Sequence, residues 1–258
     1  AVQTHLDFGA QMNLPQAIGH VGFFWSSKSS PLSQSSLFFG GHIKTTQDNV
    51  TAVSAADFVI LAVKPQSLLE LAAEIKGKIS DQAVVISIMA GVKMEKIAGE
   101  LGVKKIIRAM PNLGARIGKS MTVWTASDSI SESEKREVKN LFDKIGQELY
   151  VKDEELIGKA TAVSGSGPGF FFAMAEAWLK AAIDLGFSKE DAEKLLFNTI
   201  EASATLLRSG QSPAELKKQV ASKGGTTEAG LAVLEKHDLS GLWRDVLQAA
   251  FKRAQELS

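Results

Sequence analysis

Short apolar runs alternate with amphipathic segments along the first half of the chain. Five runs rich in β-branched and aromatic residues lie between residues 22 and 150: GFFW, DFVILAV, AVVISIMA, KKIIRAM and MTVWTA. Runs of this kind are typical of strands that are buried on both faces of a parallel sheet. Between them, residues 66–79 and 93–101 carry apolar side chains at helical spacing. The pattern predicts an α/β fold with a largely parallel sheet and crossover helices.

One further helix in this half is marked at both ends. Ser131 is followed three residues later by Glu134, which has the form of a capping box, and apolar residues continue at helical spacing up to Gly146. The spacing predicts a helix over residues 131–145.

The second half has a different periodicity. Beyond about residue 155 the strand pattern ends, and an Ala-rich chain follows. Helical spacing covers residues 169–185, 188–208, 214–220 and 239–256. Ser188 with Asp191, and the run Ser212-Pro213-Ala214-Glu215, have the form of helix starts. The change of periodicity predicts an α/β domain over residues 1–155 and an all-helical domain over residues 156–258.

Composition narrows the class of partner. Lys and Arg number 29 and Asp and Glu number 29, so no overall charge field favours nucleic acid or an anionic membrane, and a small molecule is the expected partner. The chain has no cysteine and four scattered histidines, so no metal site is expected. The apolar runs are shorter than the roughly 20 residues that span a bilayer as a helix. The N-terminal residues lack a signal-peptide pattern, and the cytoplasm is therefore the expected compartment.

Two motifs follow directly after apolar strands. AVKPQ contains Lys64 and Pro65, and RAMPN contains Arg108 and Asn112. Ligands of open parallel sheets gather at the carboxyl ends of the strands, so both motifs stand where a ligand would bind. The alternative is that each is a strand end with turn residues and a solvated charge. Neither motif by itself distinguishes a ligand-binding site from an ordinary strand end.

Two glycine-rich segments are further candidates. AVSGSGPG, residues 162–169, offers amides and hydroxyls to a ligand at close range, although it could also be a flexible connector. SKGGTTE, residues 222–228, opens into a helical pattern over residues 229–235, and free amides at a helix start suit a small carboxylate. We expect the hydroxyl of Thr226 to cap this helix, which leaves Thr227 as the candidate for substrate contact.

A fifth segment follows GFFW. Residues 26–29, Ser-Ser-Lys-Ser, contain no acidic residue at the position where NAD-selective folds hold the ribose hydroxyls. Hydroxyls and a lysine suit the 2'-phosphate of NADP. The alternative is a solvated serine-rich turn.

Taken in order, AVKPQ, SIMAG, RAMPN, AVSGSGP and SKGGTT resemble the pyrroline-5-carboxylate reductase family, from about Asn49 to the C-terminus. The resemblance implies a Rossmann-type domain over residues 1–155 that binds NADPH, with NADH also possible. It implies a helical substrate and dimerisation domain over residues 156–258, and thus a homodimer or a larger assembly of dimers. The implied reaction is reduction of 1-pyrroline-5-carboxylate to L-proline by hydride transfer, the last step of proline biosynthesis.

The resemblance also assigns contact residues. The cofactor contacts that it implies are Gly9, Ala10, Gln11, Met12, Ser27, Lys28, Asn49, Ala62, Val63, Lys64, Pro65, Ile88, Met89 and Ala90. The implied substrate contacts are Ser164, Ser222, Gly225, Thr226 and Thr227. The amides of residues 225–227 are assigned to the substrate carboxylate, and the hydroxyl of Thr227 to the ring nitrogen as the catalytic group. Hydride transfer of this kind depends on positioning and needs no nucleophile.

The N-terminal segment departs from the family pattern. THLDFGAQMNLPQA keeps Gly9 and Ala10 but has Gln11 and Leu14 where small residues of a GxGxxG or GxGxxA motif belong. Pro15 would interrupt a helix interior. Two hypotheses follow: cofactor affinity is weakened, or this stretch does not represent the natural chain faithfully.

Two other functions stay open from the sequence. A two-domain nicotinamide oxidoreductase that acts on β-hydroxyacids would share the architecture and use a lysine of the helical half. Lys180 and Lys194 lie there, but no surrounding motif supports either. A non-catalytic homologue that dimerises and binds cofactor poorly would explain the altered glycine pattern.

Overall fold

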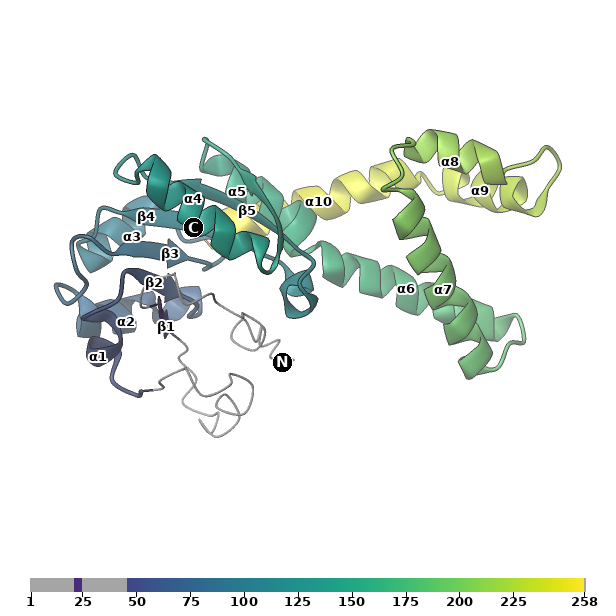
Figure 1. Ribbon diagram of the computed structural model, residues 1–258. Helices are drawn as coiled ribbons and strands as arrows, with labels where there is room; N and C mark the ends of the chain where they lie inside the picture. Colours follow the sequence, from purple (N-terminus) through teal and green to yellow (C-terminus); the bar gives the residue numbers. More distant parts are fainter. Residues whose placement is uncertain (1–20, 25–45, 258) are drawn as a thin grey trace. The chain divides into compact units, whose positions relative to one another are not determined.

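The structure is a computed structural model, which describes residues 21–24 and 46–257 of the 258-residue chain (Figure 1). The chain divides into two compact units, Ala1–Ser166 with Ala249–Ser258, and Gly167–Gln248. The last residues of the chain thus belong to the first unit. From the sequence we expect the boundary between the two domains to lie between residues 155 and 156. That boundary rests on the change of periodicity along the chain and not on compactness, so it stays a prediction.

A six-stranded sheet, in the order β1-β2-β3-β4-β5-β6, forms the centre of the first unit within the described residues. The strands are β1 Val21–Phe24, β2 Phe58–Leu61, β3 Val84–Ser87, β4 Ile106–Met110, β5 Ser120–Ala126 and β6 Gly146–Tyr150. All neighbours are parallel except β4 and β5, which are antiparallel. The α/β fold and all five predicted strands are confirmed, and β6 is an addition.

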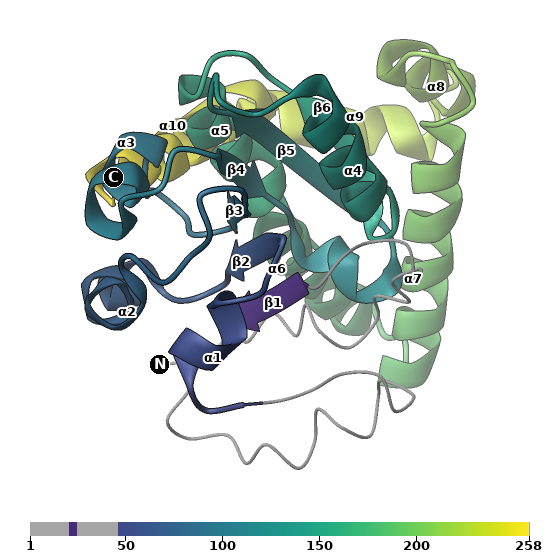
Figure 2. The same ribbon diagram turned by 60° about the vertical axis from the view of Figure 1, so that its left-hand side comes forward.

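Helices cover both faces of this sheet (Figure 2). Where the structure describes the first unit, its helical elements before the chain enters the second are α1 Asn49–Val53, η3 Pro65–Ser67, α2 Leu68–Ile75, α3 Met94–Leu101, η4 Leu113–Ile117, α4 Glu132–Asp143, α5 Glu155–Ala160 and η5 Thr161–Gly165. Apolar side chains of α2 and α3 share one buried cluster with β2 and β3, whereas α4 packs in a second cluster on the opposite face. The helices expected over residues 66–79 and 93–101 are therefore confirmed in position.

The helix that follows Ser131 forms as predicted. The Glu134 amide donates to the Ser131 hydroxyl at 3.3 Å, and the Ser131 amide donates to the Glu134 carboxylate at 2.8 Å. This reciprocal pair satisfies two amides that the first turn leaves without helical partners. Val138, Leu141 and Phe142 then face the sheet from one side of α4.

The second unit is helical, as expected. It contains α6 Gly167–Asp184, α7 Lys189–Leu206, α8 Pro213–Val220, α9 Thr226–Lys236 and most of α10 Leu239–Glu256, whose end belongs to the first unit. Ser188 caps α7, and Ser212 with Glu215 forms a capping box at α8. Within the described part of the chain, no helix is both long and apolar enough to cross a membrane.

Candidate functional site

The carboxyl ends of β2 and β3 meet at one edge of the sheet. Leu61, the last residue of β2, lies opposite Ser87, the last residue of β3. The amide of Ile88 donates to the carbonyl of Leu61 at 3.1 Å, which joins the loops that follow the two strands. The structure thus brings together residues 62–65 and 88–90, two groups that the sequence predicts to contact a cofactor.

Buried side chains and a buried hydrogen bond hold these two loops in place. The side chains of Val63 and Met89 are buried, and the buried hydroxyl of Ser87 accepts a hydrogen bond from the Met89 amide at 3.3 Å. Lys64 is exposed, and Ala90 is half-buried. The edge therefore presents backbone and small side chains on a rigid base, which suits close approach by a flat ligand.

Gly91 continues the second loop in a conformation that favours glycine. Its φ is +80°, in the left-handed region, and it lies against Leu257. A Cβ at this position would lie 2.7 Å from Cβ and 2.8 Å from the carbonyl oxygen of Leu257. Leu257, the residue after α10, thus packs on the loop, and no local pattern in the sequence indicates this contact.

Replacing Gly91 by alanine is expected to lower the free energy of unfolding by about 1–3 kcal/mol, because a side chain is strained in this conformation. The added Cβ would also displace Leu257. Gly99 in α3 is the matched control, since a Cβ there meets nothing within 4 Å. Gly99→Ala should stabilise by about 0.5–1 kcal/mol. Chemical denaturation checks both values, and equal effects of the two substitutions would contradict the account.

Asn49 has different surroundings from these loops. It is the first residue of α1, and its side-chain amide donates to the Glu74 carboxylate in the last turn of α2 at 2.6 Å. α2 begins near the end of β2 and leads away from that edge, so this bond does not join Asn49 to residues 62–65. Its assignment as a cofactor contact stays a prediction. Gly9, Ala10, Gln11, Met12, Ser27 and Lys28 lie outside the described residues.

The RAMPN and AVSGSGP motifs meet in the first unit. A Cβ on Gly165 would lie 2.9 Å from Cε of Met110, so the end of β4 packs on the π-helical turn η5. π-helical turns occur frequently at functional sites. Ser164 lies in this turn, and its hydroxyl donates to the carbonyl of Ala160 at 3.0 Å.

Two other residues of RAMPN have structural partners. Arg108 is 4% exposed and pairs with Glu154 at 2.8 Å, so the alternative interpretation as a solvated surface charge is wrong. Asn112 caps η4, where its side-chain oxygen accepts from the Gly114 amide at 3.0 Å. A Cβ on Gly114 would lie 2.5 Å from the Lys119 carbonyl oxygen, which explains the glycine in this loop.

The candidate substrate residues of the second unit lie at the start of α9. Gly225 is the N-cap residue, Thr226 and Thr227 are the first two helical residues, and no side chain caps the helix. The expectation that Thr226 caps α9 is therefore wrong. The backbone of Gly225 is extended and supplies the cap position itself, one residue earlier than expected.

This start is a tight turn with free amides. The Gly225 amide donates to the Ser222 carbonyl at 3.0 Å, and a Cβ on Gly225 would lie 2.5 Å from the Ser222 hydroxyl oxygen. The Glu228 carboxylate accepts from the Gly224 amide at 2.7 Å. Thr227 is half-buried, whereas Thr226 is exposed. First-turn amides have no helical partners and carry the positive end of the dipole, which can hold a carboxylate.

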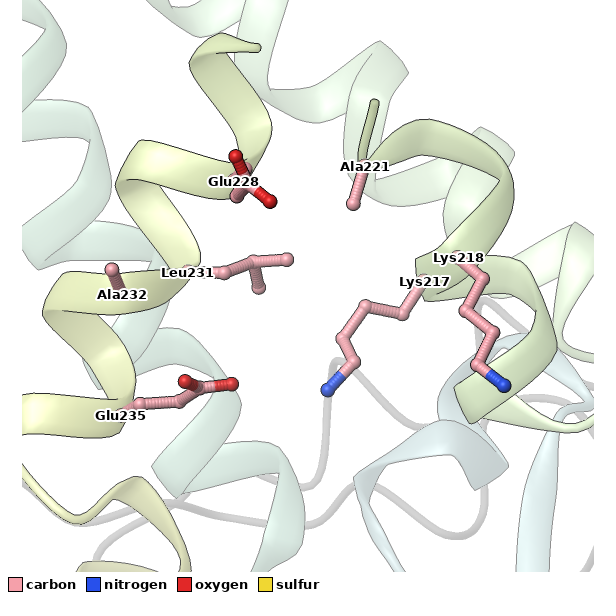
Figure 3. A pocket seen from close by; sticks show the side chains of 7 residues that line it. All are labelled: Lys217, Lys218, Ala221, Glu228, Leu231, Ala232 and Glu235. Carbon is pink, nitrogen blue, oxygen red and sulfur yellow. The ribbon is translucent and has the colours of Figure 1, made fainter. Parts of the chain in front are cut away.

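A hollow of about 300 Å³ lies between α8 and α9 (Figure 3). Its lining residues are Lys217, Lys218, Ala221, Glu228, Leu231, Ala232 and Glu235. Charges of both signs face the hollow, and Thr227 does not line it. Among the described residues, no group of three or more His, Asp or Glu side chains could hold a metal ion.

Comparison with known proteins agrees with the motif pattern. Residues 154–257 match the family model for pyrroline-5-carboxylate reductase dimerisation, and residues 25–91 match that for coenzyme F420-dependent NADP oxidoreductases. Pyrroline-5-carboxylate reductase of Staphylococcus haemolyticus (strain JCSC1435) is 36% identical over 218 residues, which cover 84% of this chain and 80% of that protein.

Two solved structures extend this likeness to the fold. A pyrroline-5-carboxylate reductase of Coxiella burnetii is 37% identical with a TM-score of 0.77, covering 84% of this chain and 81% of that one. Pyrroline carboxylate reductase of Plasmodium falciparum with NADP bound is 25% identical with a TM-score of 0.80, covering 92% and 86%. Since relatives above 30% identity align over most of both chains, the protein belongs to the pyrroline-5-carboxylate reductase family.

Proposed function

We propose that the protein reduces 1-pyrroline-5-carboxylate to L-proline with a hydride from NADPH, with NADH as a second possible donor, as the last step of proline biosynthesis. One observation supports the proposal most strongly. In a chain of this family, the loops of residues 62–65 and 88–90 lie together at the carboxyl ends of β2 and β3. Ligands of such sheets bind at this edge.

The residues at this edge fit a nicotinamide dinucleotide. Ala62 and Ala90 are half-buried and carry no side chain beyond Cβ, so a ring can approach the backbone. When bound, the cofactor supplies the hydride from C4 of its nicotinamide. NADP bound to the Plasmodium falciparum relative favours NADPH. We retain Gly9, Ala10, Gln11, Met12, Ser27, Lys28 and Asn49 as further proposed contacts.

The residues of the α9 start are proposed to hold the substrate. The first-turn amides bind its carboxylate, while the Thr227 hydroxyl bonds to the ring nitrogen as C5 accepts the hydride and the carbon–nitrogen double bond becomes single. Water or prior protonation of the imine supplies the proton on nitrogen. Ser164, Ser222, Gly225 and Thr226 complete the proposed substrate contacts.

The assembly is proposed to be a homodimer or a larger set of dimers. Large apolar side chains of the second unit are exposed, including Trp178 at 48%, Phe197 at 54% and Leu206 at 53%. Exposed apolar area of this kind marks interaction surfaces, and the region matches a dimerisation family. The balanced charge, 29 basic and 29 acidic residues, favours a small molecule over nucleic acid or a membrane, and the cytoplasm stays the proposed compartment.

Turnover assays test the proposal against its rivals. The purified protein should oxidise NADPH when pyrroline-5-carboxylate is added, and should not reduce NADP with a β-hydroxyacid. No turnover with either nicotinamide would contradict the proposed function. If turnover is absent, a titration with NADPH separates an inactive homologue that binds cofactor poorly from one that binds it well.

A further inference from the structure

One carboxylate oxygen in the first unit joins three segments of the chain. Oε1 of Glu154 accepts from Nη1 of Arg108 on β4 at 2.8 Å and from the backbone amide of Met94 at 2.8 Å. Glu154 itself directly precedes α5. A single side chain therefore links β4, the start of α3 and the start of α5.

The bond to Arg108 fixes this carboxylate in place. The Arg108 side chain is 5% exposed, and Glu154 is its only ion-pair partner among the residues that the structure describes. Loss of one partner of a buried pair leaves an uncompensated charge, which is strongly unfavourable. Arg108 thus holds Glu154 in one position relative to the sheet.

The bond to Met94 caps α3 from a distant part of the chain. Met94 is the first residue of α3, and the N-cap residue Lys93 makes no side-chain cap. An acidic group at this position satisfies a free amide and interacts favourably with the helix dipole. Because α3 begins where the loop after β3 ends, Glu154 fixes the far end of the loop that contains residues 88–90.

We propose that Glu154 is a positioning residue for the nicotinamide cofactor. It fixes the loop of residues 88–93 at its α3 end, while β3 fixes the other end. The inference rests on the proposed function, in which residues 88–90 contact the cofactor. Loss of the Glu154 contacts lets this loop move, and cofactor affinity falls.

The test compares Glu154→Gln with Glu134→Gln. Glu134 is a matched control, since its carboxylate also pairs with a cation, Lys105 at 2.9 Å, and also caps a helix start. Its side chain is 19% exposed, against 25% for Glu154. The carboxylate of Glu134 bonds to Lys105 and Ser131, and neither of these residues belongs to the loop of residues 88–93.

The readouts are the Kd for NADPH, by fluorescence titration of the full chain, and Tm. Glu154→Gln is expected to raise this Kd about tenfold, because the neutral amide oxygen can still accept both hydrogen bonds but lacks the charge that strengthens them. Glu134→Gln should leave it within about twofold while also lowering Tm. Should Glu154→Gln fail to fold, Arg108→Met with Glu154→Gln removes the unpaired charge and should show the same weakened binding.

The outcomes separate the inference from the proposed function. An unchanged Kd in the Glu154 variants, or an equal change in Glu134→Gln, would overturn the positioning role alone. Failure of the unaltered protein to bind NADPH would overturn the proposed function and, with it, the inference.

Discussion

Replacing Thr227 by alanine is expected to lower kcat/KM for pyrroline-5-carboxylate by about 10²-fold, the low end for a positioned group that assists proton transfer. Thr227 is the second residue of α9 and is half-buried beside amides that no side chain caps. If its hydroxyl bonds to the nitrogen as the hydride arrives, kcat and kcat/KM fall together. If it only anchors the substrate, KM alone rises.

Thr226→Ala is the internal control for this prediction. Thr226 is exposed, and it is the first helical residue rather than the cap. Its loss should change the free energy of unfolding by no more than about 0.5 kcal/mol and should disturb the kinetics far less. Steady-state kinetics and thermal melts of both variants decide the matter, and unchanged kinetics in Thr227→Ala would remove that hydroxyl from the mechanism.

Gly225→Ala is expected to lower kcat/KM at least about tenfold, since a displacement of about 1 Å can cost about 10²-fold. The added Cβ would lie 2.5 Å from the hydroxyl oxygen and 3.0 Å from the carbonyl oxygen of Ser222. The hydroxyl can rotate away, but the carbonyl is fixed by its bond to the Gly225 amide. The turn must therefore open, which moves the amides proposed to hold the substrate.

Gly230→Ala in the same helix separates this effect from helix propensity. A Cβ on Gly230 meets nothing within 4 Å, so the change should stabilise the protein by about 0.5–1 kcal/mol and leave kcat/KM unaltered. Comparable kinetic losses in the two variants would show that the contact with Ser222 is not the cause.

Local pattern was sufficient for most elements of the fold. Apolar runs predicted five strands, and serine with an acidic residue three positions later predicted the starts of α4 and α8. β6 was missed because its sequence, GQELY, is largely polar. It lies at the edge of the sheet and pairs only with β5 in the described part, so it needs few buried side chains.

The contacts that shape the candidate site could not be predicted in the same way. Glu154 caps α3 across 60 residues of sequence, and Leu257, which follows α10, packs on Gly91 in the loop after β3. Neither contact leaves a periodic or local signal. The cap of α9 was misplaced for a related reason: Gly-Gly-Thr-Thr offers several cap residues, and only the backbone conformation of Gly225 selects one.

Transfer of deuterium tests the proposed reaction most directly. The protein would be incubated with pyrroline-5-carboxylate and NADPH deuterated at both C4 positions of the nicotinamide, and the proline formed would be analysed by mass spectrometry. We expect proline that carries a single deuterium, located at C5. Oxidation of the cofactor without labelled proline, or proline without deuterium, would contradict it.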